Sequence, residues 1–295
     1  MIPDFSFIIL AYNEEQHLPK LFDSLKTLNA PTYLLDSGSS DKTLEICRQY
    51  NVQTAYHEFK NHPSQWDVAL KTFQIETPWI IGLDADQCLD PDLLKILLNF
   101  RDSAYEGING IYFNRKYLFK GKWIKYGGYY PFYQLKMFRK GIGSSDVNEN
   151  MDHRFIISGK SITWNKGHII EENQKENSIS FWIDKHNRYS DLLAHEEVER
   201  MQALRVQTLN PSLFGNPDER RAYLKRIWWK LPRYVRPVLY FHYRLIFQLG
   251  FLDGKTGILF HFLQAFWFRL IVDVKIEELL KNGILNERNP VKEEL

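Results

Sequence analysis

The residues most suited to chemistry are acidic. They occur in three groups, and each group directly follows a short apolar run. These acidic ends are Ala11-Tyr12-Asn13-Glu14, the segment 36–41 (Asp-Ser-Gly-Ser-Ser-Asp) and Asp84-Ala85-Asp86. Taken singly, an Asp after a strand is usually a helix cap or a turn former. Parallel sheets, however, bind ligands beyond the carboxyl ends of their strands. Three acidic strand ends in one sheet therefore predict a shared ligand site.

The chemistry that suits such a site is the handling of a diphosphate. A nucleotide-sugar carries two phosphates whose negative charge rises as the glycosidic bond breaks, and a divalent metal can stabilise that charge. Magnesium and manganese prefer carboxylates and water as ligands. Because the chain leaves the strand at Asp84-Ala85-Asp86, one carboxylate can hold the metal while the other reaches the ribose. The sequence therefore predicts transfer of a sugar from a nucleotide-sugar donor, with Mg²⁺ or Mn²⁺ as cofactor.

A sheet is needed to position these groups, and residues 1–105 alternate between strand and helix patterns. Runs of apolar residues predict strands, and apolar residues at helical spacing predict helices between them. Asp90-Pro91 is typical of a helix start, with Asp90 as the cap and Pro91 in the first turn. This alternation predicts an α/β fold with a mostly parallel sheet flanked by helices. The expected strands are 5–10, 32–35, 52–56 and 79–83, and the expected helices are 18–28, the segment around 44–47, 66–75 and the one from 90.

Later segments differ in composition. Residues 107–170 are rich in glycine, aromatic residues and strand patterns, which favours an antiparallel extension of the sheet. Residues 178–208 read as a helix, and 209–219 as a linker. We therefore divide the chain into a catalytic domain, 1–208, and a helical extension, 209–295. The catalytic domain has a nucleotide-sugar-binding half, 1–105, and an acceptor-side half, 106–208.

Composition excludes several classes of protein. The 295 residues carry a net charge of only +2, so the whole chain is not a polyanion binder. Two cysteines, Cys47 and Cys88, are too few for a disulfide framework and lack metal-ligand spacing, and both fit a reducing cytoplasm as core residues. Residues 5–11 follow no basic segment, so they do not read as a signal peptide. No uncharged apolar run reaches the roughly 20 residues of a membrane-spanning helix.

Three segments together resemble the family 2 glycosyltransferases, whose fold is called GT-A. They are 7–14 (Phe-Ile-Ile-Leu-Ala-Tyr-Asn-Glu), 35–43 (Leu-Asp-Ser-Gly-Ser-Ser-Asp-Lys-Thr) and 83–86 (Leu-Asp-Ala-Asp). The resemblance covers roughly residues 5–100 and implies a Rossmann-like mixed sheet and an inverting, single-displacement transfer. It assigns the base of the nucleotide to Asp36, the ribose side to Asp84 and the metal to Asp86, with Asp84 beside it. Other residues assigned to the nucleotide-sugar site are Ala11, Tyr12, Glu14, Ser39 and Gln65.

Further segments resemble one subgroup, the bacterial glucosyl- or heptosyl-type transferases of the lipopolysaccharide inner core. These segments are 127–131 (Gly-Gly-Tyr-Tyr-Pro), 134–139 (Gln-Leu-Lys-Met-Phe-Arg), 185–189 (Lys-His-Asn-Arg-Tyr) and 250–254 (Gly-Phe-Leu-Asp-Gly). The resemblance implies a lipid-linked saccharide acceptor in cell-envelope synthesis.

The chain departs from this subgroup at two places. The Gln-Arg-Asn of the subgroup is Gln65-Trp66-Asp67 in this chain. The loss of the Arg removes a phosphate contact that Lys60 or His62 could replace. Its Val-His-Glu becomes Val-Asn-Glu, ending at Glu149. The first departure keeps open a non-catalytic nucleotide-binding scaffold of the same fold. A nucleotidyltransferase would need a glycine-rich loop where Ala11-Tyr12-Asn13-Glu14 stands.

An inverting transfer needs a base that takes the proton of the acceptor hydroxyl on the face opposite the leaving diphosphate. We predict Glu149, which matches the family position, with Asp146 as the alternative. Trp123, Tyr129 and Tyr130 could stack on sugar faces, although aromatic residues are equally common in cores.

The C-terminal third is basic and aromatic. Two apolar helices, around 238–252 and 257–274, follow this stretch, and charged residues interrupt both. Such helices are typical of a membrane interface with anionic lipid, although nucleic-acid binding and simple packing on the catalytic domain remain alternatives. We predict a membrane-associated enzyme, peripheral or monotopic, on the cytoplasmic face of the inner membrane, with no nucleic-acid partner. The basic residues of 219–236 are Arg220, Arg221, Lys225, Arg226, Lys230, Arg233 and Arg236, against the acid Glu219.

Overall fold

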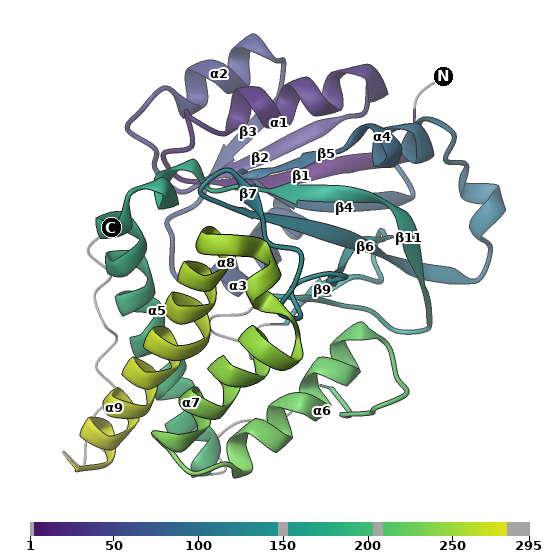
Figure 1. The fold of residues 1–295 in the computed structure, drawn as a ribbon. Helices are drawn as coiled ribbons and strands as arrows, with labels where there is room; N and C mark the ends of the chain where they lie inside the picture. Colours follow the sequence, from purple (N-terminus) through teal and green to yellow (C-terminus); the bar gives the residue numbers. More distant parts are fainter. Residues whose placement is uncertain (1–2, 147–152, 203–208, 282–295) are drawn as a thin grey trace.

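A mixed β-sheet lies at the centre of the computed structural model, which describes residues 3–146, 153–202 and 209–281 (Figure 1). In this part of the chain nine strands form the sheet in the order β3-β2-β1-β4-β8-β6-β11-β5, and β7 pairs with β6 beside this path. β9 and β10 form a separate hairpin. The strands are β1 Phe5–Ala11, β2 Thr32–Asp36, β3 Gln53–Tyr56, β4 Trp79–Asp84, β5 Gln87–Leu89, β6 Ile108–Phe119, β7 Lys122–Trp123, β8 Tyr133–Arg139, β9 Ser144–Ser145, β10 Phe155–Ile156 and β11 Lys160–Glu171.

Helices cover the sheet and extend beyond one end of it. In Figure 1 α1 and α2 lie along one face of the sheet, and the C-terminal helices gather below it. The α-helices are α1 Leu18–Leu25, α2 Thr43–Gln49, α3 His62–Thr72, α4 Pro91–Leu98, α5 Ile179–Met201, α6 Pro217–Lys230, α7 Val235–His242, α8 Gly254–His261 and α9 Phe268–Lys281. Short 3₁₀ turns are η1 Lys26–Leu28, η2 Asp102–Tyr105, η3 Gln174–Asn177 and η5 Gly250–Asp253, and the π-helical segments are η4 Tyr243–Phe247 and η6 Phe262–Trp267.

The parallel half of the sheet brings the acidic strand ends together. β1 lies between β2 and β4 and runs parallel to both. Its register pairs Ala11 with Asp36 on one side and Leu10 with Asp84 on the other. The carboxyl ends of these three strands therefore meet at one edge of the sheet, as the sequence predicted.

The other half of the sheet is mixed. β8 runs antiparallel to β4 and to β6, as expected for an antiparallel extension. β11, however, runs parallel to β6, so the expectation that the whole of 107–170 is antiparallel is wrong. After β8 the chain returns to the end of the sheet where β6 starts. Lys160 at the start of β11 therefore pairs with Ile108 at the start of β6. The α/β fold class with a mixed sheet of GT-A type, flanked by helices, is confirmed.

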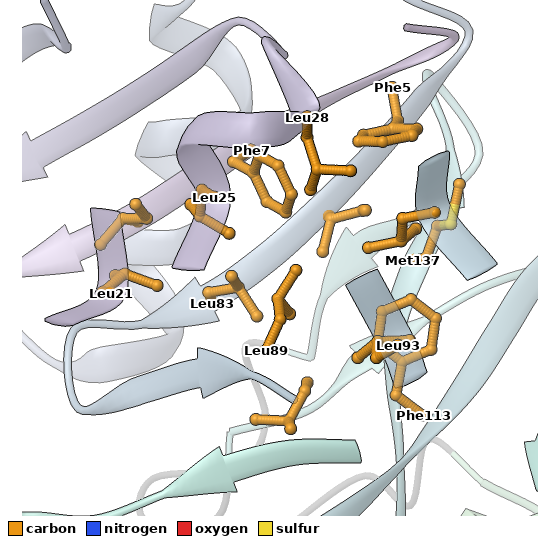
Figure 2. Packing of buried hydrophobic residues seen from close by; sticks show 14 of the residues in the cluster. Phe5, Phe7, Leu21, Leu25, Leu28, Leu83, Leu89, Leu93, Phe113 and Met137 are labelled. Carbon is orange, nitrogen blue, oxygen red and sulfur yellow. The ribbon is translucent and has the colours of Figure 1, made fainter. Parts of the chain in front are cut away.

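Two apolar clusters fix the sheet between its helices. Figure 2 shows the larger one, where Leu21 and Leu25 of α1 point toward Phe7, Leu83 and neighbouring side chains of the sheet. The smaller cluster lies on the opposite face and includes Trp66 and Ala69 of α3. Cys47 and Cys88 are buried free thiols. Burial of this kind contributes about 25 cal/mol per Å² of apolar surface.

Local capping explains where the helices begin. The Asp90 side chain accepts from the Leu93 amide at 2.9 Å and Pro91 opens α4, which confirms the predicted start. The helix expected from residue 66 instead begins at His62, because the Asn61 side chain caps it by accepting from the Ser64 amide at 2.8 Å. Apolar spacing alone missed this first turn, because it carries few apolar side chains.

The C-terminal helices are bonded to the catalytic part of the chain. The Tyr112 hydroxyl of β6 donates to Asp218 of α6 at 2.7 Å in a buried position. Arg236 of α7 is enclosed between Glu197 of α5 and Asp273 of α9 and pairs with both. The proposed division of the chain at residue 208 stays a prediction, but these bonds tie 209–281 to the catalytic part at several places.

One helical run in the described ranges, Gly250–Lys281, is long and apolar enough to cross a membrane by length and composition. Of its most apolar stretch, 44% is buried inside the protein. Much of this run packs against α5 through Val272 and Ile276.

Candidate functional site

The loops after β1 and β2 are bonded to each other and form one wall of the site. The Asn13 amide donates to Ser39 Oγ at 2.8 Å, and the Ser40 amide donates to Asn13 Oδ1 at 2.8 Å. The Glu14 amide donates to Thr43 Oγ1 at 2.7 Å. The two acidic strand ends predicted from the sequence are therefore bonded into one wall. Ala11 and Tyr12, at the end of β1 and directly after it, stay predicted nucleotide-sugar residues.

Asp36 organises the loop that follows β2. Its Oδ2 accepts from the Gly38 and Ser39 amides, both at 2.9 Å, and its Oδ1 accepts from the Ser39 hydroxyl. Gly38 has a φ of +97°, which a side chain rarely adopts. The assignment of Asp36 to the base of the nucleotide stays a prediction. The structure adds that this carboxylate holds the loop in shape.

Gln65 does not reach the open site. It is 1% exposed, and its amide group bonds to the Ser37 hydroxyl at 2.7 Å and to the His57 carbonyl at 3.0 Å. Its side-chain oxygen bonds to the His57 ring. The assignment of Gln65 to the nucleotide-sugar stays a prediction, and in the structure its enclosed side chain joins the loops after β2 and β3.

Asp84 is an ion-paired carboxylate at the end of β4. Its Oδ2 lies 2.9 Å from Lys136 Nζ on the neighbouring strand β8, and its Oδ1 lies 3.6 Å from His62 Nε2 of α3. Burial alone would raise the pKa of Asp84, but the charges of Lys136 and His62 outweigh it and hold the pKa well below its usual range. Asp84 is therefore ionised throughout the physiological range and anchored on both oxygens.

Asp86 has the opposite environment. Within the described residues its carboxylate has no side-chain hydrogen bond or ion pair, while its carbonyl accepts from the Glu172 amide at 3.0 Å. Burial, followed by the nearby charges of Glu171 and Asp84, raises the pKa of Asp86 to about 8. Lys185, the cation whose charge acts on Asp86, is already paired with Glu176, so among the described residues no free positive charge offsets the carboxylate of Asp86.

Three cation–carboxylate pairs surround Asp86. Two of them join segments that are distant in the sequence, β6 with β11 and η3 with the loop after β1, and the third joins α5 to the preceding turn η3. Gln87 adds a bond of 2.8 Å to Glu171. The pairs hold the acidic side chains at fixed positions around Asp86. They are Arg115–Glu171 at 2.8 Å, Lys185–Glu176 at 2.8 Å and Lys175–Glu14 at 3.1 Å.

This arrangement fits a divalent metal that a diphosphate helps to bind. Among residues 3–146, 153–202 and 209–281, no group of His, Cys, Asp or Glu side chains forms a complete cage. Asp86 nevertheless offers an unpaired carboxylate among other acids, which is the environment a hard cation would neutralise. Magnesium in particular is usually bound by one or two carboxylates together with phosphates and water.

Of the two candidate bases, the structure describes one. Glu149 lies outside the described residues, so its assignment stays a prediction. Asp146 is 1% exposed, and its carboxylate accepts from Arg154 Nη2 at 2.7 Å. The assignment of Asp146 as the alternative base also stays a prediction, and in the structure its carboxylate is enclosed and ion-paired.

The three aromatic residues predicted to stack on sugars lie in two different places. Trp123 and Tyr130 meet edge to face at 5.0 Å, and the Lys116 and Lys125 ammonium groups lie 5.4 and 5.5 Å from the Trp123 ring. Tyr129 packs instead against Phe260 of α8 at 4.6 Å between ring centres. Only the Trp123–Tyr130 pair keeps the form of a sugar platform.

The departure at Trp66 also has a structural explanation. Its ring is fully buried, stacks on His153 at 5.4 Å and meets Phe155 edge to face at 4.8 Å. One turn earlier, His62 reaches Asp84. The aromatic side chain is therefore a packing residue of α3, and the basic side chains next to Asp84 are those of Lys136 and His62.

Several site residues were not found by sequence reasoning. Lys136 and Lys185 lie inside segments quoted only for their resemblance to a subgroup, without a role. Arg115, Glu171 and Glu176 carried no local signal, because the strand and helix patterns around them are unremarkable. A search for charged residues within predicted buried strands would have found Arg115 and Lys136.

Comparisons with known proteins give consistent findings. A family model described as "Glycosyl transferase family 2" matches residues 6–151. Over 278 residues the chain is 26% identical to "Lipopolysaccharide core biosynthesis glycosyltransferase LpsC" of Rhizobium meliloti (strain 1021), covering 90% of this chain and 92% of the relative.

Similar solved structures have low identity and low TM-scores. TarS 1–349 of S. aureus in complex with UDP is 16% identical, with a TM-score of 0.43, over 99% of this chain and 95% of that one. The chain spans 54% of a longer S. aureus TarS structure, with 16% identity over 88% of this chain and a TM-score of 0.42. A glucosyl-3-phosphoglycerate synthase of Mycobacterium tuberculosis with Mn²⁺, UDP and glucosyl-3-phosphoglycerate is 20% identical over 40% of this chain and 45% of that one, with a TM-score of 0.29.

Proposed function

We propose that this chain, which belongs to glycosyltransferase family 2, transfers a sugar from a nucleoside-diphosphate sugar to a lipid-linked saccharide of the cell envelope. The observation that carries the proposal is Asp86, an unpaired carboxylate among paired acids at the edge where the parallel strands end. The relative named as a lipopolysaccharide core glycosyltransferase, similar over nine-tenths of the chain, supports an acceptor of that class.

The donor half of the reaction rests on the interlocked loops after β1 and β2. The carboxylate of Asp36 and the bonded pair Asn13–Ser39 fix a surface for the nucleoside. Asp84, held ionised by Lys136, is available to the ribose side. Because these groups are already positioned, they cost little reorganisation when the donor binds.

The diphosphate half rests on Asp86, with Asp84 beside it. These residues would hold a divalent metal, Mg²⁺ or Mn²⁺, which when bound would stabilise the negative charge of the leaving diphosphate. Lys185, which pairs with Glu176, and Lys175, which pairs with Glu14, add positive charge on the same side. The pairs limit the repulsion between the acids and keep Asp86 directed at the site.

The acceptor half is proposed as a single displacement with inversion. Glu149 takes the proton of the acceptor hydroxyl while that hydroxyl attacks the anomeric carbon and the diphosphate leaves from the opposite face. The platform of Trp123 and Tyr130, with Lys116 and Lys125 beside it, is suited to a saccharide that carries negative charge. We place the enzyme on the cytoplasmic face of the inner membrane, because a lipid-linked acceptor is presented there.

The test is a transfer and donor-hydrolysis assay with Mn²⁺ and a panel of nucleotide-sugars. Asp86→Ala is expected to lower turnover at least about a hundredfold, because it removes the proposed metal carboxylate. Asp92→Ala is the matched control, since Asp92 is an exposed acid in the first turn of α4. Parental activity of Asp86→Ala would refute the metal role.

A scaffold without turnover remains the second candidate, favoured by the loss of the family's Arg at Trp66. It predicts that calorimetry detects binding of a nucleoside diphosphate while no donor in the panel releases sugar. The variant His62→Ala further separates the transferase from the scaffold. If His62 replaces the missing cation beside Asp84, this variant weakens donor binding, whereas in a scaffold that uses another cation it does not.

A further inference from the structure

The outer side of the hairpin formed by α7–η4 and η5–α8–η6 is apolar along its whole length. Its exposed residues recur every three to four positions on each arm, as expected for one face of a helix. The most exposed is Phe247, at 75%. Soluble monomers rarely leave an apolar patch of more than a few hundred Å² uncovered. This hairpin face comprises Val238, Leu239, Tyr243, Ile246, Phe247, Leu249, Phe251, Leu252, Ile258, Leu259 and Phe262.

The two arms of the hairpin face are joined by a groove. The groove has a volume of about 380 Å³ and is open to the surface. The Phe241 ring lines the groove and meets the Phe262 ring of the other arm at 6.1 Å between ring centres. The two apolar stripes are therefore one surface with a hollow along it, which suits flexible hydrocarbon chains. The groove is lined by Phe241, Lys255, Ile258, Leu259 and Phe262.

Charge decides between a lipid layer and another protein. Between residues 237 and 272 the sole acid is Asp253, which is 3% exposed and accepts from the Tyr126 amide at 2.9 Å. The cations of this stretch are Arg244, Lys255 and Arg269, and because Asp253 is buried the hairpin face offers no exposed carboxylate to balance them. A second copy of the chain would bring further cations to the interface without a counter-charge. A lipid layer accepts the apolar residues in its hydrocarbon while the cations stay among phosphate-bearing headgroups, so no carboxylate of a protein partner is needed.

The inner side of the same hairpin holds the loop 126–129, which precedes the sugar platform. The Gly127 amide donates to the Gln248 carbonyl at 2.8 Å, and Arg244 Nε donates to the Gly127 carbonyl. The Arg244 guanidinium also lies 4.2 Å from the centre of the Tyr129 ring. These contacts fasten the loop to the hairpin.

We propose that the hairpin face inserts shallowly into the lipid layer, as a monotopic anchor, and seats the loop 126–129 at the lipid surface. The inference rests on the proposed function in that the acceptor is lipid-linked. It goes further by naming the surface that contacts hydrocarbon and by separating it from the basic helix α6. Apolar insertion, unlike attraction of α6 to headgroups, needs no anionic lipid.

The experiment is co-sedimentation of the full chain with vesicles of phosphatidylcholine alone and of phosphatidylcholine with phosphatidylglycerol. Phe247→Asp and Ile258→Asp each place a charge on the hairpin face, and Phe214→Asp is the matched control at a phenylalanine 94% exposed outside it. The parent is expected to bind both kinds of vesicle and to stay bound in about 0.5 M salt, where headgroup attraction is screened. Each hairpin variant is expected to bind vesicles at least about tenfold more weakly than the parent. The control variant is expected to bind like the parent.

Other results would overturn the inference. One is that the parent binds only vesicles with phosphatidylglycerol and is released by salt. Another is that the hairpin variants bind like the parent. A third is that sedimentation velocity shows a dimer that Phe247→Asp dissociates. Donor hydrolysis without vesicles is measured in parallel, and thermal unfolding checks that each variant folds. Absence of vesicle binding from the parent, with its donor hydrolysis intact, overturns the inference alone. Absence of hydrolysis from the parent, with its vesicle binding intact, counts against the proposed function instead.

Discussion

Gly127 offers a direct measurement of how tightly the hairpin holds the loop 126–129. Its φ is +67°, a conformation that an L side chain rarely adopts. A methyl group at this position would lie 2.0 Å from Cε1 of the buried His261 ring. Gly127→Ala therefore imposes both backbone strain and a steric overlap with a ring that has no room to move.

The two costs can be estimated separately. The left-handed conformation costs an alanine about 1–2 kcal/mol, and overpacking against a fixed neighbour costs about 1–3 kcal/mol. Together they predict that Gly127→Ala lowers the free energy of unfolding by about 2–5 kcal/mol. For a chain of this size that corresponds to a loss of roughly 4–20 °C in Tm.

Thermal and chemical unfolding of matched variants isolate the steric part. Gly121→Ala is the control, because Gly121 has a similar φ of +72° with nothing within 4 Å of its added methyl group. The double variant Gly127→Ala/His261→Ala should lose less than the sum of the two single variants, by about 1–3 kcal/mol, since removal of the ring relieves the overlap. If Gly127→Ala costs no more than Gly121→Ala, or if the double variant is additive, the packing of the loop on His261 is refuted.

Three further predictions concern charged and titratable groups. Burial lowers the pKa of His186 and of His261 to about 4. The unfolded chain therefore binds these protons more tightly, and stability should fall by up to about 3 kcal/mol per histidine as the pH decreases from about 6.5 to 4. Urea unfolding across this range measures the loss, and a flat profile would contradict it. Arg236→Met leaves the buried Asp273 without its partner and should lower the free energy of unfolding by about 3–5 kcal/mol; a loss below about 1 kcal/mol would show that the pair is solvated. Because the pKa of Asp86 is raised to about 8, folding at neutral pH requires this side chain to take up a proton that the unfolded chain does not hold. Asp86→Asn removes that cost and should raise stability by about 1–3 kcal/mol while it abolishes transfer. An unchanged Tm would contradict the described environment.

The strand ends of the donor half could be predicted from the sequence because the information is local. Each of β1, β2 and β4 is an apolar run that stops at an acidic residue, and parallel strands place such ends at one edge. The pairing of Ala11 with Asp36 and of Leu10 with Asp84 confirms that placement. The helix start at Asp90 is also a local signal, and it too is confirmed.

Contacts between distant segments could not be predicted in the same way. Lys136 pairs with Asp84 because β8 joins β4 in an antiparallel register, and no pattern within β8 fixes that register. The parallel pairing of β11 with β6 depends on the path of the chain around the β9–β10 hairpin. Gln65 looked like a ligand residue in sequence, yet the fold turns its amide toward Ser37. Burial and register, rather than residue type, decided these outcomes.

The bonds between the loop 126–129 and the hairpin have a consequence for how this enzyme could change its specificity in evolution. A loop reshaped for another acceptor would lose its bonds to Gln248 and Asp253 unless the hairpin changed with it. The two segments, more than a hundred residues apart, should therefore be inherited as one module. Chimeras between relatives should stay active when both segments are exchanged together and should lose activity when either is exchanged alone.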